Sequence, residues 1–548
     1  MAIKRYTANK DNTITNAFRE NLSTRGTGSN MGASDVLETF SIYGQSFSSS
    51  SLDGVTKTQE LSRVLVQFPI SDIISDRTSG KVPASGNVDF YLRLYNAKHS
   101  STVPKQMVLT VVPISSSWEE GFGLDMENYQ DLTKDVEGST WTMSAGSTQW
   151  ATVGGTYLTA STNNDYGDLR QEITFEKGTE DLELDITDVV ERWIKGTLAD
   201  GGYPNYGLGI HLTASQEAYF SSSAGGFATD SVIQNVSGAT RSYYTKKFFS
   251  RTSEFFFKRP LVEARWDSTT RDNRGNLYYS SSLLTADDNL NTIYLYNFVN
   301  GQLKNIPNLT DASAEVYVQL FSGSVSSTPT GSAIDLVTTT DYTSTAVPTV
   351  VTGGWVSTGI YSASFALTAA ATPVTKFFDV WHLDGTSQLG AQFSTGSFKP
   401  KTIRASNQNV PSSYVVNINN LKPQYDVAEN IRLRIFTRLK DWNPTIYTKA
   451  TAKVENTILD NMYFKVVRSI DDYAVIPFGT GSLSPESVGT NTTYTRLSYD
   501  VSGSYFDLDM SMLESGYMYG IKLAYYQEPG YKQFNQIFNF RVEKTEDS

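Results

Sequence analysis

The stretch LSRVLVQFPI, residues 61–70, decides the class of fold, because its side chains alternate with a period of two. One set is Leu61, Arg63, Leu65 and Gln67, and the other is Ser62, Val64, Val66 and Phe68. Since apolar residues occur in both sets, the pattern predicts a largely buried β-strand. FYLRLY, residues 90–95, and MVLTVV, residues 107–112, repeat it.

Further along the chain, DLELDI, residues 181–186, alternates strictly between acidic and apolar residues, which predicts a strand with one wet face. The next segment, TDVVERWIKG, predicts a short helix capped by Thr187 or Asp188. Its inner face would consist of Val190, Trp193 and Ile194. Many short strands around one amphipathic helix favour a jelly roll or a similar sandwich, because antiparallel sheets bury one face against another sheet.

Length and composition extend this prediction to the whole chain. With 548 residues, the protein exceeds a single hydrophobic core, and a prior of roughly 150 residues per domain gives three or four units. Its 32 Tyr, 28 Phe and 8 Trp favour strands, because aromatic side chains pack well on pleated surfaces. We therefore expect an all-β protein of tandem β-sandwiches with little helix.

Four zones divide the sequence. Residues 1–34 are polar and lack periodicity, so we expect an extended N-terminal arm that is dispensable for folding and is held by a neighbouring subunit. The other zones are a jelly-roll domain at 35–266, an immunoglobulin-like sandwich at 267–404 and a C-terminal sandwich at 405–548. The third zone has hairpin signals at Asn300-Gly301 and Asp384-Gly385, and its Thr-rich stretch 323–358 suggests loops and edge strands.

Charge and composition exclude several classes of function. The formal net charge of −12 and the pI of about 5.0 disfavour nucleic acid as a partner. One basic cluster interleaves cations with aromatics and could stack single-stranded bases, although solvated strands with buried aromatics are the simpler interpretation. It contains Lys246, Lys247, Phe248, Phe249, Arg251, Phe255, Phe256, Phe257, Lys258 and Arg259.

The chain has no cysteine, which fits assembly in a reducing cytoplasm. Residues 1–30 contain no apolar run typical of a secretion signal, and no segment predicts a membrane-spanning helix.

An ordered set of motifs gives the N-terminal half a family resemblance. The motifs are SRVLVQF (62–68), YLRLY (91–95), PISSSWEEG (113–121), LDITDVVERW (184–193), NYGLGIHL (205–212) and RPLVEARW (259–266). In this order they resemble jelly-roll modules named for a DNRLRE motif, which are similar to carbohydrate-binding modules. Residues 34–45 and 272–307 are similar to virion structural proteins of marine tailed phages. The resemblance implies a jelly-roll fold and membership of a phage particle.

Few residues point to catalysis. The three histidines, His99, His211 and His382, stand in or beside strand patterns, and no GxSxG elbow, HExxH site or phosphate loop is present. GTGSNMG, residues 26–32, is one residue longer than a dinucleotide fingerprint and lacks a βαβ context. The acidic groups Glu119, Glu120, Asp287 and Asp288 are typical of solvated loops. We therefore expect no catalytic residue and no cofactor.

Calcium is the metal that the first sandwich could hold, because related modules can carry one and hard oxygen ligands in loops suit it. Asp125 and Glu127 are the candidate ligands.

Two functional hypotheses follow. The first is a structural component of a tailed-phage virion, in the tail, neck, collar or fibre, which binds other virion proteins and copies of itself. The alternative is a receptor-binding or decoration protein that binds host surface polysaccharide through an aromatic platform in the jelly roll. The candidate platform residues are Trp118, Trp141, Trp150 and Tyr157, for which core packing is the competing interpretation.

Overall fold

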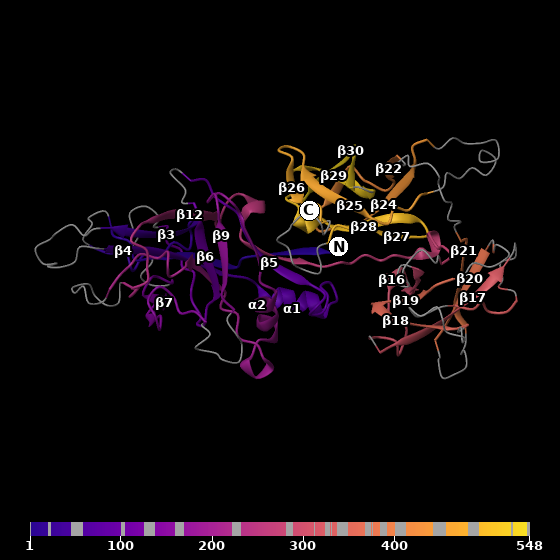
Figure 1. The fold of residues 1–548 in the computed structure, drawn as a ribbon, viewed down its shortest axis with the longest axis horizontal. Coiled ribbons are helices and arrows are strands. Elements are labelled where there is room, and N and C mark those ends of the chain that lie inside the picture. Colours follow the sequence, from indigo (N-terminus) through magenta and orange to yellow (C-terminus); the bar gives the residue numbers. More distant parts are fainter. Residues whose placement is uncertain are drawn as a thin grey trace, which may run out of the picture. The chain divides into compact units, whose positions relative to one another are not determined.

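The computed structural model divides into two compact units (Figure 1). The N-terminal unit spans Ala2–Trp266, and the C-terminal unit comprises the described residues from Asp267 onward. The structure describes residues 2–19, 24–44, 58–99, 105–124, 138–158, 169–221, 232–280, 289–311, 313–323, 329, 331–336, 349–367, 374, 376–383, 392–400, 413–441, 456–479, 493–527 and 530–544. The all-β class with sandwich-like sheets, which the sequence predicts, is confirmed.

Two antiparallel sheets build the N-terminal unit, and the chain crosses between them repeatedly, as in a jelly roll. The four-stranded sheet has the order β1 (Ile3–Thr7), β13 (Leu261–Arg265), β5 (Asp89–Leu94) and β10 (Leu182–Asp185). The seven-stranded sheet has the order β12 (Tyr243–Phe249), β3 (Val36–Gly44), β4 (Thr58–Gln67), β11 (Leu208–Leu212), β6 (Met107–Pro113) and β9 (Gln171–Phe175), with β2 (Lys10–Thr15) paired to β4.

Two helices and a small hairpin complete this unit. Helix α2 (Thr187–Lys195) confirms the predicted helix and buries Val189, Val190 and Trp193. The predicted details differ, because Ile186 occupies the cap position in place of Thr187 or Asp188, and Ile194 is only partly buried. Helix α1 (Ile70–Thr78) lies against it, and Arg77 Nη1 donates to Glu191 Oε2 at 2.8 Å. The hairpin of β7 (Met143–Ala145) and β8 (Thr148–Gln149) belongs to the loop that follows β6.

The prediction of a separate arm at residues 1–34 is wrong. β1 pairs with β13, and β2 pairs with β4 from Lys10↔Gln67 to Thr15↔Ser62, so this segment supplies one strand to each sheet. Its polar composition is misleading, because Asn12, Thr15 and Asn16 are buried and hydrogen-bonded; Asn16 Oδ1, for example, accepts from the Leu61 amide. Deleting residues 1–34 would remove two paired strands, so we do not expect the protein to fold without this segment.

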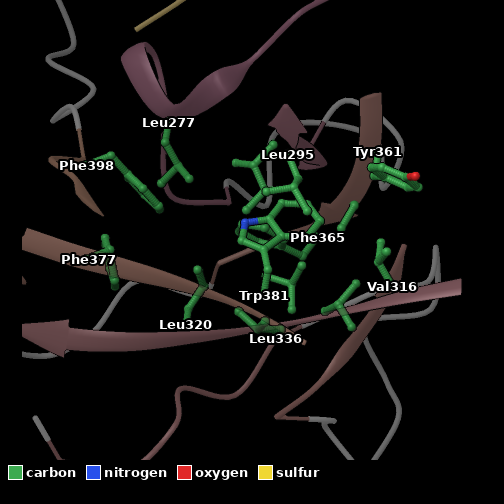
Figure 2. Packing of buried hydrophobic residues seen from close by; sticks show 14 of the residues in the cluster. Leu277, Leu295, Val316, Leu320, Leu336, Tyr361, Phe365, Phe377, Trp381 and Phe398 are labelled. Carbon is green, nitrogen blue, oxygen red and sulfur yellow. The ribbon is translucent and has the colours of Figure 1, made fainter. Parts of the chain in front are cut away.

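A six-stranded sheet forms the first part of the C-terminal unit. Its order is β14 (Asn291–Tyr296), β19 (Ile360–Phe365), β18 (Val351–Ser357), β17 (Glu315–Gly323), β20 (Lys376–His382) and β21 (Gln392–Phe398). The core lies against one face of the sheet, with Trp381 at its centre and Phe365, Leu295 and Leu336 around it (Figure 2). β18 lies between β19 and β17, so this part of the Thr-rich stretch is an internal strand and not the edge strand we expected.

The hairpin predicted at Asn300-Gly301 is confirmed. It joins β15 (Phe298–Val299) to β16 (Gln302–Leu303), and both turn residues have positive φ, 54° and 78°, as a primed two-residue turn requires. Asp384-Gly385 lies outside the described residues.

The last part of the chain forms a sandwich of two sheets. One has the order β22 (Tyr414–Ile418), β24 (Asn430–Leu439), β28 (Gly503–Asp509) and β27 (Ser498–Asp500). The other has the order β23 (Gln424–Asp426), β30 (Gly530–Glu543), β29 (Met518–Gln527), β25 (Met462–Arg468) and β26 (Tyr473–Ile476). Phe464 of β25 stacks on Phe506 of β28 with ring centroids 4.2 Å apart, which joins the two sheets through their core.

One short segment ties the six-stranded sheet to this sandwich. The amide of Asp272 donates to the Tyr499 carbonyl of β27, and Arg274 in the short helix η4 (Asn273–Gly275) reaches the six-stranded sheet. The Arg274 guanidinium binds Asp272 and the buried carboxylate of Asp379, which also accepts from Trp381 Nε1 at 2.9 Å. Residues 272–274 are therefore shared by both parts, which explains why they form one compact unit.

Candidate functional site

The aromatic residues predicted to bind carbohydrate lie in the connection between β6 and β9, whose described residues 114–124 and 138–158 we call the loop layer. This loop layer covers one face of the seven-stranded sheet. Exposure is 2% for Trp118, 0% for Trp141 and 5% for Trp150, and Tyr157 is half-buried. They pack with Leu61 and other core residues of the underlying strands. The prediction that these four residues form an exposed aromatic platform is therefore wrong, because the three indole rings form the core of the loop layer.

Hydrogen bonds fix these rings in place. Trp118 Nε1 donates to the Tyr206 carbonyl at 2.7 Å, and Trp150 Nε1 donates to the Thr140 carbonyl at 2.9 Å. The ring of Trp141 lies against Gly154, where a Cβ atom would come within 2.8 Å of it. A ligand could reach these rings only if the loop layer opened.

Two buried asparagines hydrogen-bond to the loop layer: Asn12, which is in β2, and Asn30, which lies between β2 and β3. Asn12 Nδ2 donates to the carbonyl oxygen of Ser139 at 2.8 Å, and its Oδ1 accepts from the Met31 amide at 3.0 Å. Asn30 Nδ2 donates to the carbonyls of Glu120 and Ser139, while its Oδ1 accepts from the amide of Gly123. Because both side chains are 0% exposed, losing either would leave several backbone groups buried without partners.

A buried ion pair lies beneath the same layer. Arg63 of β4 binds Glu217 through two hydrogen bonds, Nε–Oε1 at 3.0 Å and Nη2–Oε2 at 2.8 Å. The Arg63 guanidinium also lies 5.6 Å from the ring centre of Trp141 and 5.7 Å from that of Tyr157. Burial, assisted by the nearby Arg63 charge, lowers the pKa of His211 to about 3, so its neutral imidazole donates from Nδ1 to the Leu212 carbonyl. These groups bind one another inside the protein.

The four-stranded sheet carries a second network of charges. Glu263 of β13 is completely buried and binds Arg5 and Arg265, each at 2.7 Å, with Arg93 at 3.7 Å. Burial opposes the charged form of Glu263, but the three guanidinium groups outweigh it and hold its pKa well below the usual range. This cluster cross-links β1, β13 and β5.

The basic and aromatic cluster at 246–259 separates into two parts. Lys246 is buried, donates to the carbonyls of Gly178 and Glu180, and has a pKa that burial lowers to about 8. Lys247 pairs with Glu38 at 2.6 Å, and Arg251 pairs with Glu120. A basic strip for nucleic acid is therefore not formed by these three residues.

Phe248 and Phe257 of this cluster are buried, but its last part reaches the surface. Phe255 and Phe256 are 49% and 38% exposed, and Lys258 and Arg259 lie over their rings at 5.5 and 5.8 Å from the ring centres. Within the described part of the chain, neither cation forms an ion pair. We call these four residues the aromatic–cationic ridge.

A second exposed apolar group lies at one end of the six-stranded sheet. Phe298 and Val299 of the β15–β16 hairpin are 60% and 41% exposed, and Val356 of β18 is 46% exposed. The hairpin lies beside the β18–β19 turn, because the amide of Gly359 and Nε1 of Trp355 both donate to Asn305 Oδ1. We call Phe298, Val299 and Val356 the apolar end.

The predicted calcium ligands Asp125 and Glu127 lie outside the described residues, as do Asp287 and Asp288. Among the residues that the structure does describe, no three acidic, histidine or cysteine side chains gather in a way that could hold a metal ion. No helix in that part of the chain is long and apolar enough to cross a membrane. His99 Nε2 lies 3.0 Å from Asn96 Oδ1.

Sequence reasoning missed the buried charges. Arg63 stands in an apolar strand, LSRVLVQF, and Asp379 stands in another, KFFDVWHL. A charge inside such a run is a usable signal, because a charged side chain is almost never fully buried unless it is paired. The partners themselves, Glu217 and Arg274, could not be identified, since they lie 154 and 105 residues away.

Comparison with known proteins adds little to this geometry. No protein-family model matches the chain, and no curated protein matches it. Among solved structures, the chain is similar to the N-terminal Ig1-2 module of the Drosophila receptor protein tyrosine phosphatase DLAR. That alignment has 9% identity and a TM-score of 0.14, and covers 46% of this chain and 91% of the module. A TM-score this low carries no argument about fold or function.

Proposed function

We propose that this chain is a structural component of a tailed-phage virion that acts by binding other virion proteins and copies of itself. The observation that carries the proposal is the apolar end of the six-stranded sheet. Phe298, Val299 and Val356 expose large apolar side chains on the C-terminal unit, and such exposure is a mark of protein–protein contact when it is grouped.

The apolar end is held rigidly, which suits a permanent contact. Phe298 continues a ladder of stacked rings from β14, with Tyr294–Tyr296 centroids 6.2 Å apart and Tyr296–Phe298 centroids 6.5 Å apart. The primed turn at Asn300-Gly301 fixes the hairpin that presents Phe298 and Val299. Side chains that are already ordered lose little entropy on binding, so a small surface can contribute useful affinity.

The phage setting is supported by the sequence resemblance of residues 34–45 and 272–307 to virion structural proteins. Assembly in a bacterial cytoplasm is supported by the lack of cysteine. An N-terminal arm does not provide the attachment, since Ile3–Thr7 and Lys10–Thr15 are paired strands of the two sheets.

The proposal is tested on purified, nuclease-treated particles of the phage that encodes the chain. We expect mass spectrometry to find the chain at a fixed ratio to the other virion proteins, and its absence would contradict the proposal. In particles complemented with variants, Phe298→Ser combined with Val356→Ser should reduce incorporation about tenfold or more, because it removes two apolar anchors. Ile470→Ser is the matched control, since Ile470 is a 76% exposed side chain elsewhere in the same unit.

A further inference from the structure

The aromatic–cationic ridge is built as a rigid surface. Its turn, the short helix η3 (Phe256–Lys258), is anchored by the buried side chains of Ser253 and Phe257. Arg259 Nε donates to the Ser253 carbonyl at 2.9 Å, and the Lys258 amide donates to the Phe255 carbonyl at 2.9 Å. The exposed rings are thus presented by a turn that is fixed on both sides.

The position of the cations indicates which kind of partner fits. Lys258 lies over the rings of Phe249 and Phe255, at 5.1 and 5.5 Å, and Arg259 lies over Phe256. A nucleobase or a sugar ring binds an aromatic by stacking on a free face, and here a cation occupies one face of each exposed ring. A protein surface that offers carboxylates to the cations and apolar groups to the rings fits this arrangement better.

The order of charges along the segment is self-complementary. Glu254 is exposed and precedes the two exposed phenylalanines, and Lys258 and Arg259 follow them. Within the described residues, no ion pair engages any of these three charges. A two-fold axis through the phenylalanines would place Glu254 of one copy opposite the cations of the other, which is the arrangement of an isologous dimer.

We propose that residues 254–259 form a two-fold contact with the same residues of a second copy of this chain. The exposed rings of Phe255 and Phe256 would pack at the centre, and Glu254 would pair with Lys258 and Arg259 across the axis. The contact is small compared with a stable interface of roughly 1,600 Å², so we expect weak self-association of the free chain at high concentration, which the closeness of copies in an assembly would strengthen. The inference deepens the proposed function and rests on it.

Charge reversal in the full-length chain tests this contact by sedimentation velocity. Reversing one side, with Glu254→Lys alone or with Lys258→Glu plus Arg259→Glu, should weaken self-association about tenfold or more, because like charges then face each other. Mixing these two variants should restore association, since each supplies the charges that the other needs. The triple variant that carries all three reversals should associate with itself again. Circular dichroism confirms that each variant is folded.

Other outcomes would overturn the contact. Wild-type chain that stays monomeric at the highest concentration reached, or a triple variant and a mixture that both fail to associate, would contradict it. Binding of a single-stranded oligonucleotide that Phe255→Ala abolishes would assign the ridge to nucleic acid instead. If the one-sided variants enter particles normally and associate like the wild type, the two-fold contact fails while the structural role stands. Absence of the chain from particles would contradict the structural role itself.

Discussion

The guanidinium of Arg63 and the carboxylate of Glu217 form a bidentate ion pair whose side chains are only 8% and 6% exposed. It joins β4 to the segment that follows β11 across 154 residues of sequence. Two rings, those of Trp141 and Tyr157, lie beside the guanidinium. Arg63 Nη1 also donates to the Gly154 carbonyl at 3.1 Å, so the paired guanidinium fastens the loop layer to the sheet.

Removing one member of this pair should be costly, because the other is left as an unpaired buried charge. We expect Arg63→Met to lower the free energy of unfolding by about 3–5 kcal/mol. Arg63→Met combined with Glu217→Met should cost clearly less than the sum of the two single changes. Urea unfolding followed by tryptophan fluorescence measures each value.

The matched control is Arg432→Met, which breaks the pair between Arg432 and Asp507, whose side chains are 46% and 32% exposed. Its cost should stay below about 1 kcal/mol. If the double variant loses as much unfolding free energy as the two single variants together, Arg63 and Glu217 do not stabilise each other, contrary to the structure.

Asp11 makes the stability of the N-terminal unit depend on pH. Burial raises the pKa of Asp11 from 3.8 to about 7, and the amide of Arg251 donates to its Oδ2. Its Oδ1 is buried and has no partner among the described residues. The folded state therefore binds this proton more tightly than the unfolded state. The contribution of Asp11 to stability is largest below pH 4 and is lost as the pH rises toward 7.

Asp11→Asn should accordingly stabilise the protein at pH 8 and change little at pH 4. The full shift corresponds to about 4 kcal/mol, which is the largest gain we expect. Thermal unfolding across this pH range checks the prediction, with the exposed Asp35→Asn as control. A gain at pH 8 that persists at pH 4 would mean that it does not arise from the titration of Asp11.

Gly154 should tolerate a side chain poorly because it adopts a positive φ of 79° and an added Cβ would come within 2.8 Å of the Trp141 ring. Gly80 has a similar φ of 73°, but an added Cβ would meet nothing within 4 Å. Gly80→Ala should cost about 1–2 kcal/mol from backbone strain alone. Gly154→Ala should cost about 1–3 kcal/mol more, because the indole must move. Equal losses of unfolding free energy would show that the ring yields freely.

The clamp formed by Arg274 and Asp379 should hold the C-terminal unit together. Asp379→Ala leaves both the Arg274 guanidinium and the Trp381 indole N–H without this acceptor, so we expect a loss of about 3–5 kcal/mol. Limited proteolysis should then cut the segment around residues 267–280 sooner. Asp471→Ala is the control, since it disturbs only partly exposed contacts, the pair with Arg468 and the hydrogen bond from the Tyr473 amide. Unchanged protection of the segment in Asp379→Ala would contradict the role of the clamp.

Sequence alone determined the features that depend on neighbours in the chain. The strand in residues 61–67, the helix in residues 187–195 and the turn at Asn300-Gly301 were predicted correctly, because side-chain period and positive φ are local properties. Ile70, which the same pattern included, instead begins helix α1.

The tertiary structure decided which side chains are covered. Asn12 stands in a polar segment that predicts an arm, yet Ser139 satisfies it from 127 residues away. The three indoles of the loop layer could equally have faced solvent, since aromatic composition does not say whether a loop folds back over its sheet. A side chain is buried by contacts with segments that are distant in the sequence, so no local pattern of residues predicts its burial.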